Sequence, residues 1–261
     1  MSIRLLFTLY TISTANNKKL TKFNFLRIRK RNLSSKENYY TDLVIWGTNL
    51  GSTAKQGRFT KQVRGMIHLP PYQYSVIVGL LLSDGWLSLS ESRTLKNARL
   101  DFRQSINKSA YVWFVFNCLN HYCSRYPYSY ASIRNDKPHY NLTITTRALP
   151  CFTELYYLFY NKGKKIIPHN IYDLLTPVAL AHLIMGDGTA LSSGFGICTD
   201  SFSIKDVVKL LNVLIIKYNF NCVLHNDRGR YRIYINKSSM PQLIKIVLPH
   251  MIPSMMYKFR L

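Results

Sequence analysis

The sequence predicts an α+β fold built from two similar repeats. Two segments carry this prediction, because Ile77–Gly85 and Leu180–Gly188 are both apolar runs that end in one aspartate followed by glycine. The elements that follow each run also agree in type and order. The two runs lie about one hundred residues apart, whereas solenoid repeats recur every 20 to 50 residues or so. The pattern therefore indicates two subdomains rather than a solenoid.

The first half reads as a helix, a strand, a helix and a strand. Prolines at 70 and 71 precede the apolar run, and proline is common in the first turn of a helix. Residues 98–105 read as a strand, 110–122 as a helix and 140–145 as a second strand. The last of these alternates with the two-residue period of a half-buried strand. Another apolar helix and a lysine-bearing segment, Gly163–Pro168, follow.

The second half repeats this order. Thr176 fits the N-cap of its apolar helix, and Pro177 fits the first helical position. The following strand, helix, strand and lysine-bearing segment are expected at residues 194–201, 204–218, 231–236 and 252–258. The two halves therefore end on equivalent lysines.

The two aspartates are expected on the last turns of their helices, with Gly85 and Gly188 as left-handed capping residues. A carboxylate at the C-terminal end of a helix gains nothing from the helix dipole. Asp84 and Asp187 are therefore better explained by a bound cation than by helix stability. Small residues on both helices, including Gly79 and Gly186, would let the helices approach closely and bring these carboxylates together.

The charge balance points to a polyanionic partner. The chain has 35 basic and 12 acidic residues, for a net charge of +23. A membrane surface is the rival partner, but no apolar stretch reaches the roughly 18 residues of a transmembrane helix, which favours nucleic acid. Two carboxylates brought together on so basic a protein indicate a divalent-metal site that faces a phosphodiester.

The cysteines do not form a metal-binding or disulfide pattern. The five, at positions 118, 123, 151, 198 and 222, include no C-x-x-C pair, so we expect reduced and mostly buried thiols. His121 lies close to two of them in sequence, but on a helix this spacing favours core packing.

The N-terminal part differs in composition from the rest. Residues 1–36 hold nine Lys or Arg and no acid. This composition suits a mitochondrial transit peptide, a basic arm that touches phosphates, or translated sequence from an upstream reading frame. Residues 38–71 read as a linker. We expect an extension and linker at 1–57, a first repeat at 58–170 and a second repeat at 171–261.

These motifs together resemble the LAGLIDADG homing endonucleases, in the single-chain, two-motif form of mitochondrial introns, from about Arg58 to Leu261. The chain is similar to the branch that contains the yeast omega-intron endonuclease. The resemblance rests on the two apolar-Asp-Gly helices, on Lys164–Pro168 and on Met255–Lys258. Two positions depart from a symmetric motif pair. The sixth motif residue is not acidic in either helix, and the third is Gly79 in one and His182 in the other.

The resemblance implies two pseudo-symmetric αββαββα repeats whose antiparallel sheets form a DNA-binding saddle, with the LAGLIDADG helices at the interface. It implies that Asp84 and Asp187 bind Mg²⁺ or Mn²⁺ and are catalytic, with Lys165 and Lys258 near the scissile phosphates. Basic residues on or next to the strands are DNA-binding candidates: Arg99, Arg103, Arg134, Lys137, Arg228, Arg230 and Arg232.

The implied function is site-specific cleavage of double-stranded DNA at a long recognition site, such as an intron-insertion site, by a mitochondrial monomer with no membrane partner. The alternative is an RNA maturase that helps its host intron splice, and a third possibility is a purely DNA-binding protein. Gln104 and Asp200 occupy matching strand positions in this alignment. They would hold water near the metals or serve a structural or DNA-facing role.

Overall fold

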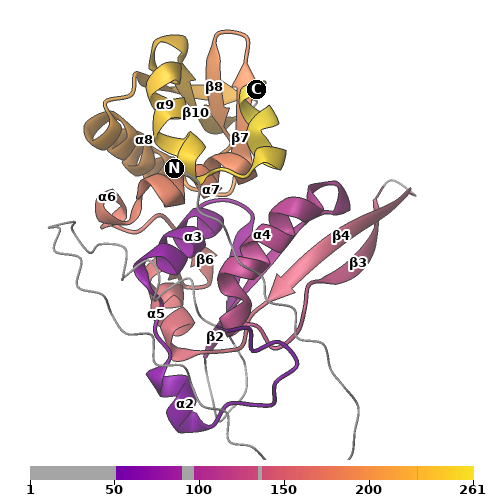
Figure 1. Cartoon of the computed structure of the whole chain (residues 1–261). Coiled ribbons are helices and arrows are strands. Elements are labelled where there is room, and N and C mark those ends of the chain that lie inside the picture. Colours follow the sequence, from indigo (N-terminus) through magenta and orange to yellow (C-terminus); the bar gives the residue numbers. More distant parts are fainter. Residues whose placement is uncertain (1–50, 90–96, 135–136, 228) are drawn as a thin grey trace, which may run out of the picture. The chain divides into compact units, whose positions relative to one another are not determined.

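The two halves of the chain form the same succession of elements in the computed structural model (Figure 1). The structure describes residues 51–89, 97–134, 137–227 and 229–261, all within one compact unit. The basic segment 1–36 lies outside these residues. The short helix α2 (Lys61–Met66) precedes the first repeat.

Each repeat has the order αββαββα, as predicted. The first contains α3 (Pro71–Leu81), β1 (Gly85–Leu89), β2 (Ala98–Ser105), α4 (Ser109–Leu119), β3 (Tyr128–Arg134), β4 (Lys137–Thr145) and α5 (Pro150–Phe159). The second contains α7 (Pro177–Asp187), β7 (Gly188–Leu191), β8 (Gly194–Ile197), α8 (Ile204–Tyr218), β9 (Cys222–Asp227), β10 (Arg230–Asn236) and α9 (Met240–Val247). Between the repeats lie β5 (Tyr160–Asn161), β6 (Lys164–Lys165) and α6 (Ile171–Leu174). Five short 3₁₀ helices complete the described part: η1 (Ile106–Lys108), η2 (Asn120–Tyr122), η3 (Lys237–Ser239), η4 (Leu248–His250) and η5 (Pro253–Phe259).

The two four-stranded sheets have identical topology. Their strand orders are β1-β2-β4-β3 and β7-β8-β10-β9, and all neighbouring strands are antiparallel. The residue after each aspartate begins the first strand, with Gly85 opposite Phe102 and Gly188 opposite Ile197. This register makes Phe102 and Ile197 equivalent.

Each sheet has a core face and an open face. Side chains alternate between the faces of a strand, and Phe102 and Phe195 are buried on the core face. Phe102 lies edge-on against Tyr111 of α4 at 5.5 Å, and Phe195 stacks on Phe259 of η5 at 4.9 Å. The open faces carry polar and aromatic side chains instead, including Trp86, Ser88, Arg103, Tyr130, Thr143, Thr189, His225, Arg232 and Tyr234.

The two motif helices begin as their sequences predict. Pro71 is the first residue of α3. Thr176 caps α7 by accepting a hydrogen bond from the amide of Ala179 at 3.2 Å, and Pro177 begins the helix. This cap satisfies one of the amides that lack a partner within the first turn.

The helix ends differ from the sequence prediction. Helix α7 does include Asp187, but α3 ends at Leu81, so Asp84 lies in the following turn. The prediction of left-handed capping glycines is wrong. Gly188 has φ −79° and ψ 149°, and the described glycines with positive φ are Gly163 and Gly229. Both Gly85 and Gly188 instead continue directly into strands.

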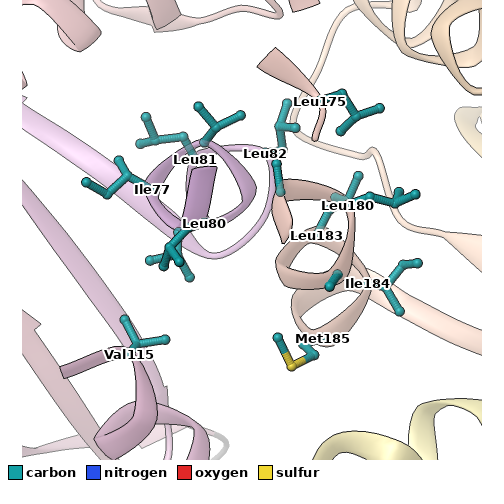
Figure 2. Packing of buried hydrophobic residues seen from close by; sticks show 14 of the residues in the cluster. Ile77, Leu80, Leu81, Leu82, Val115, Leu175, Leu180, Leu183, Ile184 and Met185 are labelled. Carbon is teal, nitrogen blue, oxygen red and sulfur yellow. The ribbon is translucent and has the colours of Figure 1, made fainter. Parts of the chain in front are cut away.

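The core between the repeats is formed by α3 and α7, which are apolar on nearly every side. Figure 2 shows leucine and isoleucine side chains of both helices packed around this contact. Ile77, Leu80, Leu180, Leu183 and Ile184 are completely buried. A helix that is hydrophobic all round is stable only when it is surrounded by protein.

The described thiols are free, and Cys123, Cys151 and Cys222 are buried, in line with the reduced cysteines expected. The ring of His121 lies 3.0 Å from the carbonyl oxygen of Gly51, in a polar contact to the backbone. None of the described helices is both long enough and apolar enough to cross a membrane.

Candidate active site

Two glycines set how closely α3 and α7 approach. A Cβ atom on Gly79 would lie 2.4 Å from the Ala179 carbonyl oxygen and 2.5 Å from the His182 Cβ. A Cβ atom on Gly186 would lie 2.6 Å from the Ser83 side chain and 3.1 Å from Asp84 Oδ2. The absence of side chains at both positions therefore brings Asp84 against the last turn of α7. The expected opposition of Gly79 and His182 is confirmed.

Gly186→Ala is expected to destabilise the fold by about 1–3 kcal/mol, because the new methyl group overpacks a filled contact. Gly65→Ala is a matched control, since nothing lies within 4 Å of a Cβ built at Gly65 in α2. That exposed helical change should be neutral or slightly stabilising. Thermal unfolding of both variants measures the difference, and equal melting temperatures would contradict the close approach of the helices.

Across this contact, Asp84 lies close enough to Asp187 for its charge to act on that carboxyl group. The pKa of Asp187 is raised to about 7, mainly by burial and to a smaller extent by the charge of the neighbouring Asp84 carboxylate. The Asp84 carboxylate accepts a short hydrogen bond from the amide nitrogen of Gln104, a buried residue of β2. A bound cation would relieve the cost of ionising Asp187 beside a second carboxylate.

Lys165 and Lys258 lie beside these carboxylates, one from each repeat. The ammonium of Lys165 donates to the carbonyl oxygen of Gly85 at 2.6 Å. The ammonium of Lys258 donates to the carbonyl oxygens of Gly186 at 3.0 Å and Gly188 at 2.8 Å. Each lysine is thus held on the backbone next to an aspartate.

Burial lowers the pKa of Lys165 to about 8, although Asp187 and Asp84 both act to raise it. Burial also lowers the pKa of Lys258, and the positive charge of Lys108 lowers it further. Both ammonium groups are therefore partly desolvated, which strengthens their attraction for an anion.

Gln104, which the sequence offered as a water-holding or structural residue, lies in the site, and Lys108 is a further charged group there that the sequence did not indicate. Lys108 ends η1, directly after β2, and its charge acts on both Asp187 and Lys258. The sequence signal for it is weak, because a lysine after a strand is common on a protein surface. Only the turn of η1 brings its charge back toward the aspartates.

The proposed match between Gln104 and Asp200 is shifted by one residue. Because Phe102 is equivalent to Ile197, Gln104 corresponds to Thr199. The Thr199 hydroxyl donates to the Tyr231 carbonyl oxygen at 2.6 Å. Asp200 accepts hydrogen bonds from Arg230 at 3.1 Å and from Arg232 at 3.1 Å. Hydrogen bonding to Arg232 lowers the pKa of Asp200 to about 2, so this carboxylate serves an arginine network.

Several of the candidate DNA-binding arginines lie on the open faces of the sheets. Arg103 lies on the open face of the first sheet with its guanidinium 4.4 Å from the Tyr130 ring centroid. Arg99 pairs with Asp101 at 3.1 Å. The backbones of Arg134 and Lys137 form the ends of β3 and β4, and Arg228 lies outside the described residues.

A groove in the open face of the second sheet reaches Asp187. Its volume is about 370 Å³, and Asp187, Thr189, Gly196, His225 and Arg232 contribute to its lining. Arg232 also bonds Asp227 at 2.7 Å, so its guanidinium is held between two carboxylates. This arrangement fixes the arginine in a defined orientation at the groove.

Comparison with known proteins agrees with the predicted fold. Residues 74–243 match the LAGLIDADG DNA endonuclease family. The chain belongs to this family. The match spans both motif helices and both sheets, as the sequence resemblance predicts.

Curated relatives of the family member include maturases and an endonuclease. Cytochrome b mRNA maturase bI2 of Debaryomyces hansenii is 31% identical over 189 residues, covering 70% of this chain and 71% of that protein. The protein of the same name from Saccharomyces cerevisiae is 34% identical over 197 residues, which cover 70% of this chain and 46% of the yeast protein. Intron-encoded endonuclease ai4 of Dictyostelium discoideum is 39% identical over 110 residues, covering 41% of this chain and 69% of that protein.

A solved structure of the homing endonuclease I-WcaI bound to its DNA recognition sequence has the same fold as this LAGLIDADG chain. The TM-score is 0.70 at 24% identity, with 78% of this chain and 94% of that one covered. The fold prediction is therefore confirmed.

Proposed function

We propose that this protein is a site-specific homing endonuclease that makes a metal-dependent double-strand break in DNA. The observation that carries the proposal is the meeting of Asp84 and Asp187, with one lysine ammonium held beside each strand start. This arrangement combines acidic ligands for a cation with positive charge for a phosphodiester. A long recognition site, such as an intron-insertion site, fits the two open sheet faces.

The donor set suits Mg²⁺ or Mn²⁺ bound mainly through water and phosphate. Within the described ranges, no three His, Cys, Asp or Glu side chains gather as a metal-binding group. Magnesium is commonly held by one or two carboxylates with waters and substrate phosphates as its other ligands. Asp84 and Asp187 would hold the cation, which would supply an activated water and neutralise charge on the phosphate.

The lysines and Gln104 have roles that follow from their contacts. Each lysine ammonium would stabilise negative charge on a scissile phosphate or orient the attacking water. The amide of Gln104 orients the Asp84 carboxylate by donating to Oδ2. Because these groups are partly or fully buried, their interactions with substrate are less screened than those of surface charges.

The open faces would contact the DNA major groove as a saddle. Arg103 is presented there over the Tyr130 ring and Arg232 is held between Asp200 and Asp227, while Arg99 and Arg230 are each paired with one aspartate. Arginine fixed in this way suits base-edge or phosphate recognition. Arg134, Lys137 and Arg228 remain candidates by sequence.

The organisation supports a monomer whose repeats run from about residue 58 to 170 and from 171 to 261. Both motif helices lie in one chain, so no second copy is needed to pair the aspartates. Mitochondrial location is supported by relatives named for cytochrome b mRNA and by the basic segment 1–36.

The second candidate function is that of an RNA maturase, and the names of two similar relatives favour it. A maturase of this fold would need the basic surface but not the paired aspartates and lysines. The presence of all four groups at the motif positions favours the nuclease.

The deciding experiment uses a supercoiled plasmid that carries a target selected by binding from a randomised duplex library. We expect linear product in Mg²⁺ and uncut plasmid in EDTA, because cleavage requires the cation. Specific binding without nicking in either Mg²⁺ or Mn²⁺ would contradict the nuclease assignment. Splicing of host-intron RNA by such an inactive protein would instead establish the maturase.

A further inference from the structure

The segment that precedes the first repeat is attached to it through residues 51–59. We call residues 51–66, which end in α2, the strap. The amide of Thr53 donates to the Asn120 carbonyl at 3.3 Å, and that of Lys55 donates to the Ser124 carbonyl at 2.9 Å. The buried Thr53 hydroxyl also lies 2.7 Å from the His121 carbonyl oxygen. Residues 51–59 are therefore fixed on the first repeat, whereas the sequence suggested a linker.

Arg147 provides the main side-chain attachment of the strap. Its guanidinium donates to the carbonyl oxygens of Thr53 at 2.9 Å, Gln56 at 3.0 Å and Gly57 at 3.0 Å. The same group lies over the Phe59 ring, 4.2 Å from its centroid. One side chain thus holds three backbone carbonyl groups of the strap in place.

The strap is uniformly basic. It contains Lys55, Arg58, Lys61 and Arg64, spaced three residues apart, and no acidic residue. The first three are exposed and Arg64 is half-buried. No salt bridge joins these four to a carboxylate elsewhere in the described part of the chain. Unpaired like charges held close together repel one another, and a polyanion relieves this repulsion.

The strap lies beside the segment that leads into β3, since the Lys55 ammonium is 5.3 Å from the Tyr126 ring centroid. Next to Ser124, the Arg125 guanidinium lies 3.9 Å from the ring centroid of Tyr128 in β3. The Tyr128 hydroxyl lies 3.4 Å from Thr145 Oγ1 on the open face. Helix α2 lies on the far side of the first repeat from α7 (Figure 1). The strap therefore adds basic residues beside the start of β3, and its helix α2 lies on the side of the first repeat away from α7.

We propose that the strap binds backbone phosphates of duplex DNA that flanks the recognition site, beyond the base pairs covered by the sheets. This inference rests on the proposed function, since it needs DNA along the open faces. Exposed lysine and arginine contact phosphates without reading sequence. The strap would therefore add affinity on the side of the first repeat without changing the recognised sequence.

The test compares Arg58→Gln/Lys61→Gln with the control Lys205→Gln/Lys245→Gln, which removes the same charge from exposed positions on α8 and α9. Each protein is titrated in EDTA with two probes. One is a short duplex of the binding-selected target, and the other extends it by about one helical turn, roughly 10 base pairs, at each end.

The wild type and the control should bind the long duplex more tightly than the short one. The strap variant should lose this gain, roughly 10-fold in Kd, and its log K against log salt should flatten by about two on the long duplex only. All proteins should bind the short duplex alike.

Equal binding of the long duplex by the strap variant and the control would overturn the inference. So would a wild type that gains nothing from the flanks, or a strap variant that weakens only on a host-intron RNA probe. None of these outcomes affects cleavage of the target plasmid by the wild type, so the proposed nuclease would stand or fall separately.

Discussion

Asp84→Asn and Asp187→Asn are each expected to abolish double-strand cleavage while leaving DNA binding largely intact. Each change keeps the shape of the side chain but removes a charge that the proposed mechanism uses to hold a divalent cation. Loss of one such electrostatic group costs at least about 100- to 1,000-fold in rate. Single-turnover cleavage at saturating protein, with binding titrations in EDTA, measures both effects. Wild-type cleavage by either variant would refute the paired-ligand assignment.

A stability measurement shows whether the Asp187→Asn protein is folded and reports the metal site independently. The folded-state pKa of Asp187 is about 7, against an ordinary value of 3.8. The folded state favours the neutral form of Asp187, so the resulting gain in folding stability is fully present below pH 3.8 and is lost as the pH rises through about 7. In metal-free buffer at pH 8, the asparagine variant should thus melt at a higher temperature than the wild type. Mg²⁺ should raise the melting temperature of the wild type but not of the variant.

Lys165→Met and Lys258→Met are each expected to slow cleavage on the order of 100-fold at saturating protein, as loss of one transition-state donor does. The repeats are only pseudo-symmetric, since Gly79 lies opposite His182 and Gln104 corresponds to Thr199. Each lysine should therefore affect the two strands unequally. Separate nicking rates for the top and bottom strands measure this difference.

Lys164→Met is the matched control for Lys165→Met, because Lys164 is exposed and adjoins it in β6. It removes the same charge without touching the Gly85 carbonyl, so it should change only binding, with a salt slope smaller by about one. If both test variants cut both strands at the wild-type rate once saturated, the lysines are phosphate anchors and not catalytic.

The duplication could be predicted because short sequence patterns repeat in the two halves of the chain. Two apolar runs ending in Asp-Gly, the Thr176-Pro177 helix start and the strands that alternate in polarity all reflect short-range preferences. The structure contains the elements that these preferences predict, namely α3, α7 and the strands of the two sheets. The positions of the lysine segments were readable for the same reason, because they repeat at matching points.

Details of the site were less predictable, since they depend on strand register and turn geometry. The strand register makes Thr199, and not Asp200, the counterpart of Gln104. Because side chains alternate between the two faces of a strand, an alignment that is wrong by one residue assigns the side chain to the wrong face. The roles assigned to Gly85 and Gly188 failed because chain direction after Asp84 and Asp187 is set by sheet pairing, not by helix capping.

The sequence by itself determined the fold class, the two aspartates and the basic character that implies a polyanion. Only the tertiary structure decided which groups surround those aspartates and how the strap is attached to the first repeat. Gln104 and Lys108 join the site through β2 and η1, and Arg147 reaches back across more than 80 residues to bond Gln56 and Gly57. Such contacts depend on packing between distant segments, and no local pattern of residues encodes them.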